Sequence, residues 1–448
     1  MSEKRSSFTG KIGFVLAAAG SAVGLGNIWR FPYLAAKYGG GIFLLVYVIL
    51  AVTLGFSLMC AEIAIGRKTG KSAIGAFASL DKRFGFIGWM AAIVPVIILP
   101  YYSVIGGWVS KYFFVFLTGG ASASAGDGYF EAFIGRPIEP LGWFLLFLGL
   151  TALIVLFGVE KGVEKVSKVM MPLLVLLTLG IAVYVLFMPG AMKGVAYYLT
   201  PDFTKFSATT VLAAMGQLFY SMSIAMGIMI TYGSYMKKEI RLESSVHQIE
   251  IFDSGIAFLA GLMIVPAVFT IGEEIEKPGP GLMFQTLPRV FEKMPGGVIV
   301  GAVFFLLVFF AALTSSISLM ETIVSLLQDK LGWSRRVSCL AVFLGSLLLG
   351  VPSSLGFGLL SDISIAGLSI LDMFDFASNS VLMPIVALLT CIFVGYVLKP
   401  KALIEEMEIG GKFSSKWLFT IVIKYVAPIC IVLILISSVL DGLGIVKI

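Results

Sequence analysis

Residues 17–30 read AAAGSAVGLGNIWR, and this stretch decides the fold because it interrupts a long apolar segment. Its glycines, together with Ser21 and Asn27, weaken a helix at a depth where lipid offers the backbone no hydrogen bonds. Where a helix unwinds, carbonyl oxygens lose their amide partners and can coordinate a cation, while the exposed helix N-terminus attracts an anion. We therefore expect a membrane-spanning helix that is broken near its middle.

A second stretch of this kind, YSMSIAMG at residues 220–227, lies at the equivalent depth of a later apolar segment. Small residues at such spacing also form packing seams between membrane helices, and this alternative stays open for each stretch alone. The two stretches, however, open two successive five-helix units, residues 11–187 and 208–398. This spacing favours an inverted repeat with a site between broken helices 1 and 6, followed by an additional helix at 417–440.

The composition of the chain places it in a membrane. Of 448 residues, 58% are hydrophobic and 13% are charged, and the mean hydropathy is +1.01. Apolar segments recur along the whole length, each long enough to cross about 30 Å of hydrocarbon as a helix. We expect an all-α polytopic protein, one transporter domain over residues 1–448, with eleven transmembrane helices near 11–37, 41–66, 86–118, 141–158, 166–187, 208–235, 249–272, 297–327, 336–354, 366–398 and 417–440.

The basic residues set the expected orientation. They gather in short clusters on alternate connections, so the net charge of +6 reflects topology and predicts no nucleic-acid partner. The positive-inside rule then places the N-terminus in the cytoplasm and, with eleven spans, the C-terminus outside, in a bacterial inner membrane. Lys4, Arg5 and Lys11 precede an apolar run as in a signal peptide, but the run continues, so we expect an uncleaved first helix.

Catalytic chemistry has little support in this sequence. The four cysteines lie inside apolar runs without metal spacing, and the one histidine, His247, is expected in a polar connection. A membrane enzyme would need a nucleophile with a base or a metal cluster. We therefore expect no enzyme, no organic cofactor and no obligate protein partner, only a small-molecule substrate and the lipid bilayer.

Polar and ionisable residues inside the spans are functional candidates, because lipid makes them costly. The eighth span carries Thr314, Ser315 and Ser316, which could ligate a hard cation or simply bond back to their own backbone. Acidic residues within or near the ends of spans are Glu62, Asp253, Glu321 and Asp375, of which Glu62 and Glu321 are expected to be buried hydrogen-bonding acids. A basic residue of the last span, Lys424, is expected to snorkel or face lipid.

The stretch 17–30, followed by Phe31-Pro32-Tyr33 and Gly39-Gly40-Gly41, resembles the first-helix signature of the neurotransmitter:sodium symporter family. The resemblance extends over essentially the whole chain and is strongest with the family's bacterial branch, which transports hydrophobic and aromatic amino acids. Other stretches that carry it are Tyr101-Tyr102, Trp108, residues 217–235, LTSSIS at 313–318 and residues 372–379. It implies a sodium-coupled symporter that works by alternating access.

The resemblance also implies site residues. Two sodium ions would bind, the first at Ala22, Asn27, Ser221 and Asp253, and the second at Gly20, Val23, Ala311, Thr314 and Ser315. The substrate would lie against Ser21, Ala22, Gly26, Ile98, Tyr102, Tyr220, Ser223, Met226 and Leu319. An outer gate would pair Arg30 with Asp375, and an inner gate would pair Arg5 with Asp329.

Two features of this chain refine what the resemblance implies. The family's chloride position would comprise Tyr47, Gln217, Ser221, Asp253 and Ala257. Many relatives have asparagine where Asp253 stands, and chloride-dependent relatives have serine where Ala257 stands. A fixed or protonatable carboxylate at Asp253 would then supply the missing negative charge, which predicts chloride independence. Monoamine carriers have an aspartate where this chain has Gly24, so the substrate is expected to bring its own carboxylate.

Proton coupling in the same architecture is the alternative to sodium coupling. A receptor or channel is a further alternative to a transporter.

Overall fold

The computed structural model describes residues 7–271, 279–365 and 367–442, and within these ranges it contains helices and no β-strand. Among the described residues, nine helices are long and apolar enough to cross a membrane, and one bent pair adds a tenth span. The predicted all-helical membrane fold is confirmed. The sixth predicted span consists of two pieces, α12 and α13, that are too short to qualify separately, so the eleventh crossing depends on taking them together.

The first five spans each consist of one helix or of a few helical pieces in succession. Their bounds are α1 (Lys11–Ala22) with η1 (Gly26–Arg30) and α2 (Phe31–Lys37); α3 (Gly41–Leu50), η2 (Ala51–Gly55) and α4 (Phe56–Thr69); η3 (Lys82–Phe84) and α6 (Gly85–Leu117); α9 (Glu139–Leu156); and η4 (Val159–Glu164) with α10 (Lys165–Leu186).

Several of the later spans also consist of more than one helical piece. Their bounds are α12 (Ala208–Ser221) and α13 (Ile228–Ser234); α14 (Leu242–Ile271); α16 (Gly297–Leu331); α17 (Arg335–Leu355); α18 (Ile370–Asp375), η7 (Phe376–Leu382), α19 (Met383–Ile392) and η8 (Phe393–Val397); and α21 (Lys416–Ile421), η9 (Val422–Val426) and α22 (Ala427–Gly442).

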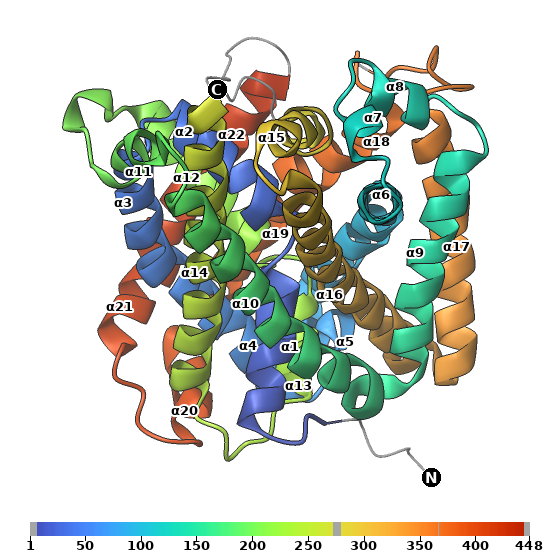
Figure 1. Ribbon diagram of the computed structural model, residues 1–448. Coiled ribbons are helices and arrows are strands. Elements are labelled where there is room, and N and C mark those ends of the chain that lie inside the picture. The colour runs from blue at the N-terminus through green and yellow to red at the C-terminus, as the bar shows by residue number, and fades with distance from the viewer. Residues whose placement is uncertain (1–6, 272–278, 366, 443–448) are drawn as a thin grey trace.

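Short helices in the connections were not predicted from the sequence. They cap both ends of the bundle, with α11, α15, α7 and α8 at the top of Figure 1 and α20 at the bottom. Their bounds are α5 (Ala73–Leu80), α7 (Ala121–Ser124), α8 (Tyr129–Ile134), α11 (Ala191–Leu199), η5 (Phe203–Lys205), η6 (Leu282–Thr286) with α15 (Leu287–Lys293), and α20 (Pro400–Glu408).

The broken first span lies inside the bundle, where α1 packs against α10, α14 and α16 (Figure 1). Its residues are almost all buried, whereas α9, α17 and α22 show large apolar side chains on the outside. In a lipid-embedded bundle the polar residues face the interior. The first span and its neighbours therefore form the part of the fold in which a polar site can be built.

One expectation about the helix limits is wrong. His247 was expected in a polar connection, but α14 already begins at Leu242, so the histidine lies on a helix. Its ring stacks on Phe56 with centroids 4.5 Å apart, and its Nδ1 lies 3.1 Å from Glu250. The sequence did not predict this start of α14, because residues 242–248 are mostly polar and lack the apolar run by which the span was located.

Candidate functional site

The first break separates α1 from η1 at Val23, Gly24 and Leu25. Val23 has extended backbone angles (φ −72°, ψ 100°), and the two halves of the span are bent by 56°. Ser315 of α16 points its hydroxyl oxygen at three carbonyl oxygens of this segment, those of Gly20 (3.4 Å), Ser21 (3.1 Å) and Val23 (3.3 Å). One hydroxyl proton cannot satisfy three acceptors, so the oxygens form an electron-rich cluster that suits a hard cation.

The second break joins α12 to α13 through residues 222–227. Ser223 and Ala225 have positive φ angles of 53° and 65°, which non-glycine residues adopt only when their surroundings enforce it. Glu62 of α4 supplies part of that enforcement, because its buried Oε1 accepts a 2.7 Å hydrogen bond from the amide of Ala225. Glu62 is thus a buried hydrogen-bonding acid, as the sequence predicted, and it holds the unwound turn.

Asn27 brings the two broken spans together with α14. Its amide nitrogen donates to Ser221 Oγ (3.1 Å) and to Asp253 Oδ1 (2.7 Å). Ser221 donates to the same carboxylate oxygen at 2.7 Å, and the Tyr47 hydroxyl donates to the other at 3.2 Å. Three of the four residues predicted for the first sodium ion are therefore in direct contact, and the fourth, Ala22, ends α1 beside them.

The residues predicted for the second sodium ion also converge. Thr314 lies close to α1, since a Cβ added to Gly20 would meet the Thr314 Cβ at 3.2 Å. Its hydroxyl donates to the carbonyls of Phe310 (3.0 Å) and Ala311 (3.2 Å), while the neighbouring Ser315 reaches Gly20 and Val23. The back-bonding alternative thus holds for the Thr314 hydroxyl in this conformation, but both side chains lie against the broken helix.

A cavity of 40 Å³ lies between the two breaks. All nine residues predicted for the substrate line it, from Ser21 and Ala22 on the first span to Leu319 on α16. The Tyr102 hydroxyl reaches into it and accepts a 3.4 Å hydrogen bond from the amide of Leu25. The cavity is also lined by residues that the sequence reasoning did not place at the substrate, among them Tyr101, Ile228 and Asn379.

Tyr220 separates this cavity from a larger one of 300 Å³, since it lines both, and we call the larger one the outer cavity because the predicted outer-gate residues line it. Its ring is so close to Gly26 that an added Cβ would lie 2.3 Å from it. Only glycine therefore allows this tyrosine to lie across the break. The Tyr220 side chain is thus part of the wall of both cavities.

The two residues predicted for the outer gate face each other across the outer cavity without an ion pair between them. The Arg30 guanidinium lies 5.1 Å from the ring centroid of Tyr220, a cation–π distance. Asp375 instead accepts hydrogen bonds from the Tyr101 hydroxyl (3.0 Å) and the Asn379 amide (2.7 Å). The predicted pair is not formed in this conformation, in which both residues line the cavity of 300 Å³.

Asp329, predicted for the inner gate, accepts a 2.7 Å hydrogen bond from the Ser72 amide at the other end of the bundle. Its predicted partner, Arg5, lies outside the described residues. Of the residues named for the chloride position, Tyr47 and Ser221 contact Asp253, whereas Gln217 donates to the Gly26 carbonyl at 3.1 Å and Ala257 is fully buried.

Two helices broken at one level, with oxygen clusters and a cavity between them, define a membrane transporter that moves a small solute with cations. The comparisons with known proteins agree. A model of the sodium:neurotransmitter symporter family matches residues 5–124 and 137–443. The chain therefore belongs to this family, and it is a sodium-dependent membrane transporter.

Individual relatives extend over nearly the full chain. The uncharacterized sodium-dependent transporter YhdH of Bacillus subtilis is 36% identical over 98% of both chains. The sodium- and chloride-dependent GABA transporter 2 of Homo sapiens is 27% identical over 90% of this chain and 75% of its own. The crystal structure of MhsT in complex with L-phenylalanine is 38% identical and has a TM-score of 0.88, covering 97% of this chain and 100% of that one.

Proposed function

We propose that the protein is a secondary active symporter that imports a hydrophobic or aromatic L-amino acid together with two sodium ions. The observation that carries this proposal is the cavity between two unwound turns, flanked on one side by the contacts of Asn27 with Ser221 and Asp253 and on the other by the oxygen cluster around Ser315. A zwitterion needs both kinds of group that a broken helix exposes, carbonyl oxygens for its ammonium and amides for its carboxylate.

Both sodium sites are built from hard oxygen donors. The first combines Asn27, Ser221 and the Asp253 carboxylate with the Ala22 carbonyl and completes its shell with the carboxylate of the substrate. This shared ligand couples the ion to the substrate. The second combines Thr314 and Ser315 with the carbonyls of Gly20, Val23 and Ala311, so its occupancy ties α1 to α16.

The substrate pocket is polar at the breaks and apolar elsewhere. Tyr102 holds the substrate carboxylate, while Ile98 and Met226 surround the side chain, and methionine adapts its shape to bulky groups. A Cβ added at Gly24 would lie 2.8 Å from Ser315 Oγ and 3.1 Å from the Tyr102 hydroxyl oxygen, so the acid that a carboxylate-free amine would require would have to displace these two side chains. The bound L-phenylalanine in the related MhsT structure also favours an aromatic substrate.

Transport is independent of chloride in this proposal. The Asp253 carboxylate is fully buried and is held by Asn27, Ser221 and Tyr47. When ionised it provides a negative charge next to the first sodium ion, which is the role that a bound chloride would otherwise have. The alanine at position 257 offers no hydroxyl to such an anion.

Alternating access follows from the two cavities. The open outer cavity admits ions and substrate, Tyr220 then covers the substrate, and Arg30 pairs with Asp375 as the cavity closes. Residues 11–187 and 208–398 act as the two inverted repeats, with the N-terminus in the cytoplasm and the C-terminus outside the inner membrane. At 100 mV one sodium ion supplies about 2.3 kcal/mol, and a tenfold gradient adds about 1.4 kcal/mol, enough for an accumulation of roughly a few hundredfold.

The test is uptake into liposomes that contain only the purified protein and an imposed gradient. Labelled L-phenylalanine, L-tryptophan, L-tyrosine and L-leucine are offered with an inward sodium gradient or an inward proton gradient. We expect sodium-driven accumulation of at least one of them, with the same rate when gluconate replaces chloride. Accumulation that ignores sodium and follows the proton gradient would establish the proton-coupled alternative instead.

A further inference from the structure

A cavity of 560 Å³ opens at the end of the molecule that carries α20, far from the substrate site. Its lining comes from the end of the tenth span, from α20 and from the start of the eleventh span. Figure 1 shows α20 at the bottom of the bundle. Its charged lining comprises two acids and four bases, Glu405, Glu408, Lys399, Lys401, Lys416 and Lys424. Nothing in the transport cycle described above uses these residues.

The charges in this cavity do not balance. Lys416 lies 2.7 Å from Glu408, and Lys401 lies 4.0 Å from Glu405. Among the described residues no carboxylate forms an ion pair with Lys399 or with Lys424. Two ammonium groups therefore line one cavity with no protein anion to neutralise them, and this favours an anionic ligand.

Lys424 is placed for such a ligand by the packing of two spans. It lies well inside the apolar segment Lys416–Leu440, where a charged residue is costly unless it has a role. Its side chain runs past Gly395, where an added Cβ would lie 3.4 Å from the Lys424 Cγ. The Tyr396 hydroxyl donates to the Lys424 carbonyl at 2.6 Å and so fixes the π-helical turn that carries the lysine.

Lys399 shows a second sign of a functional position. Its φ angle is +67°, a backbone conformation that glycine adopts at much lower cost, and Pro400 follows it. Strained backbone of this kind persists where the surrounding structure enforces it and is concentrated at functional sites. The residue in this strained conformation is an exposed lysine that lines the cavity and has no acidic partner among the described residues.

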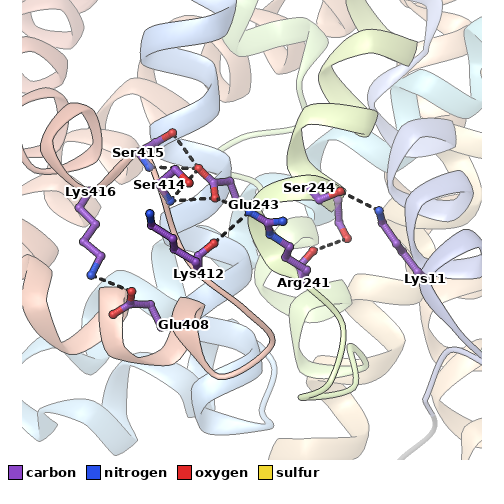
Figure 2. A network of polar contacts seen from close by, with 10 residues as sticks. Lys11, Arg241, Glu243, Ser244, Glu408, Lys412, Ser414, Ser415 and Lys416 are labelled. Atoms are coloured by element: carbon purple, nitrogen blue, oxygen red, sulfur yellow. Dashed lines mark hydrogen bonds and ion pairs between the residues drawn. The ribbon is translucent and has the colours of Figure 1, made fainter.

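The connection next to the cavity is held in place by α14. Figure 2 shows Glu243 accepting hydrogen bonds from the amides of Ser414 (2.9 Å) and Ser415 (3.0 Å), beside the pair of Lys416 and Glu408. Arg241 contacts the Lys412 carbonyl at 3.1 Å in the same network. The cavity is therefore preorganised, because ordering this connection costs nothing further when a ligand binds.

We propose that this cavity binds the headgroup of an anionic phospholipid, with the phosphodiester between Lys399 and Lys424. The ligand chemistry, a phosphate ester, could also come from a soluble phosphate. A lipid is favoured because the exposed rings of Trp417 and Tyr425 continue the apolar outer surface of the last span, on which acyl chains would lie. Basic clusters at the membrane surface attract anionic lipids, and aromatic residues gather at the same level.

The test is lipid retention by the purified full-length protein. The protein is extracted into detergent with equal amounts of phosphatidylglycerol and phosphatidylcholine, and bound lipid is measured by native mass spectrometry. We expect phosphatidylglycerol to be retained in preference, and the double variant K399Q/K424Q to lose it by roughly 25-fold, about fivefold for each lysine. The double variant K399R/K424R, which keeps both charges, should retain it.

The matched control is K412Q, in the same connection but outside the cavity lining. Equal loss in K412Q would mean diffuse attraction to a basic surface and would overturn the proposal, as would retention that is unchanged in K399Q/K424Q. Displacement of the lipid by millimolar inorganic phosphate or glycerol 3-phosphate would identify a site for soluble anions instead. Monodisperse elution and the thermal stability of each variant separate loss of the ligand from loss of the fold.

Discussion

Ser221 donates a 2.7 Å hydrogen bond to the Asp253 carboxylate, and this contact joins the end of α12 to the middle of α14 at a position buried from solvent. Asn27 of the first span donates to the same carboxylate oxygen at 2.7 Å. One acidic side chain therefore links both broken spans to a continuous one. A change in the charge of Asp253 should therefore alter sodium affinity, substrate affinity and the conformation of the first break.

Asp253→Asn tests the role of this charge. The amide keeps the shape of the side chain but removes the fixed negative charge, so we expect sodium-driven uptake in gluconate medium to fall by about tenfold or more. Adding chloride to the double variant D253N/A257S should restore part of the rate, because the introduced serine offers the anion a hydroxyl. The control is D202N, in an exposed connection, and full chloride-free uptake by D253N would contradict the account.

Ser315→Ala and Thr314→Ala test the second sodium site. Each removes one hydroxyl oxygen from beside the carbonyls of the first break, so we expect the sodium concentration for half-maximal uptake to rise by roughly tenfold. Thr322→Ala is the matched control on the same helix, since its hydroxyl donates to the Ser318 carbonyl at 2.8 Å and lies away from the break. An equal rise for T322A would indicate a general effect on α16.

Ile98→Phe tests the shape of the substrate pocket. The larger ring fills space beside Met226 that a bulky substrate side chain would occupy, so competition by L-tryptophan should weaken by about tenfold, and L-alanine should compete relatively better. The measurement is inhibition of labelled uptake by a panel of unlabelled amino acids. An unchanged order of competition would place the substrate side chain elsewhere.

Asp375→Asn tests closure of the outer cavity. Because Arg30 is stacked on Tyr220 in this open conformation, the account predicts that Arg30 and Asp375 pair only after substrate and sodium have bound. Ser380 lines the outer cavity, so S380C should react with a membrane-impermeant thiol reagent about tenfold more slowly when both ligands are present. In the D375N background this protection should disappear; protection that persists would argue against the gate.

The sequence predicted the two breaks well because the physical signal is local. Glycines and polar side chains within residues 20–27 and 220–227 weaken a helix in lipid, and the helix is interrupted within both stretches. The convergence of Asn27 with Ser221 and Asp253, by contrast, came from resemblance, since residues more than 190 positions apart carry no local sign of contact. Spacing alone could not have paired them.

Other features had no sequence signal of this strength. The short helices α5, α11 and α20 lie outside the long apolar runs by which the spans were located. Asn379 lines both the outer and the inner cavity, yet a single asparagine within a span does not by itself indicate a cavity. The unpaired state of Arg30 and Asp375 depends on the conformation, which a sequence does not specify.

The most direct test of the two-break account is the number of sodium ions bound at equilibrium. Binding of ²²Na⁺ to the purified protein with saturating L-phenylalanine should reach two ions per chain, falling toward one in S315A or in N27A. Removing the amino acid should weaken the site at Asn27 in particular, because the substrate carboxylate completes it. Absence of saturable sodium binding, or a stoichiometry unaffected by both substitutions, would contradict the account.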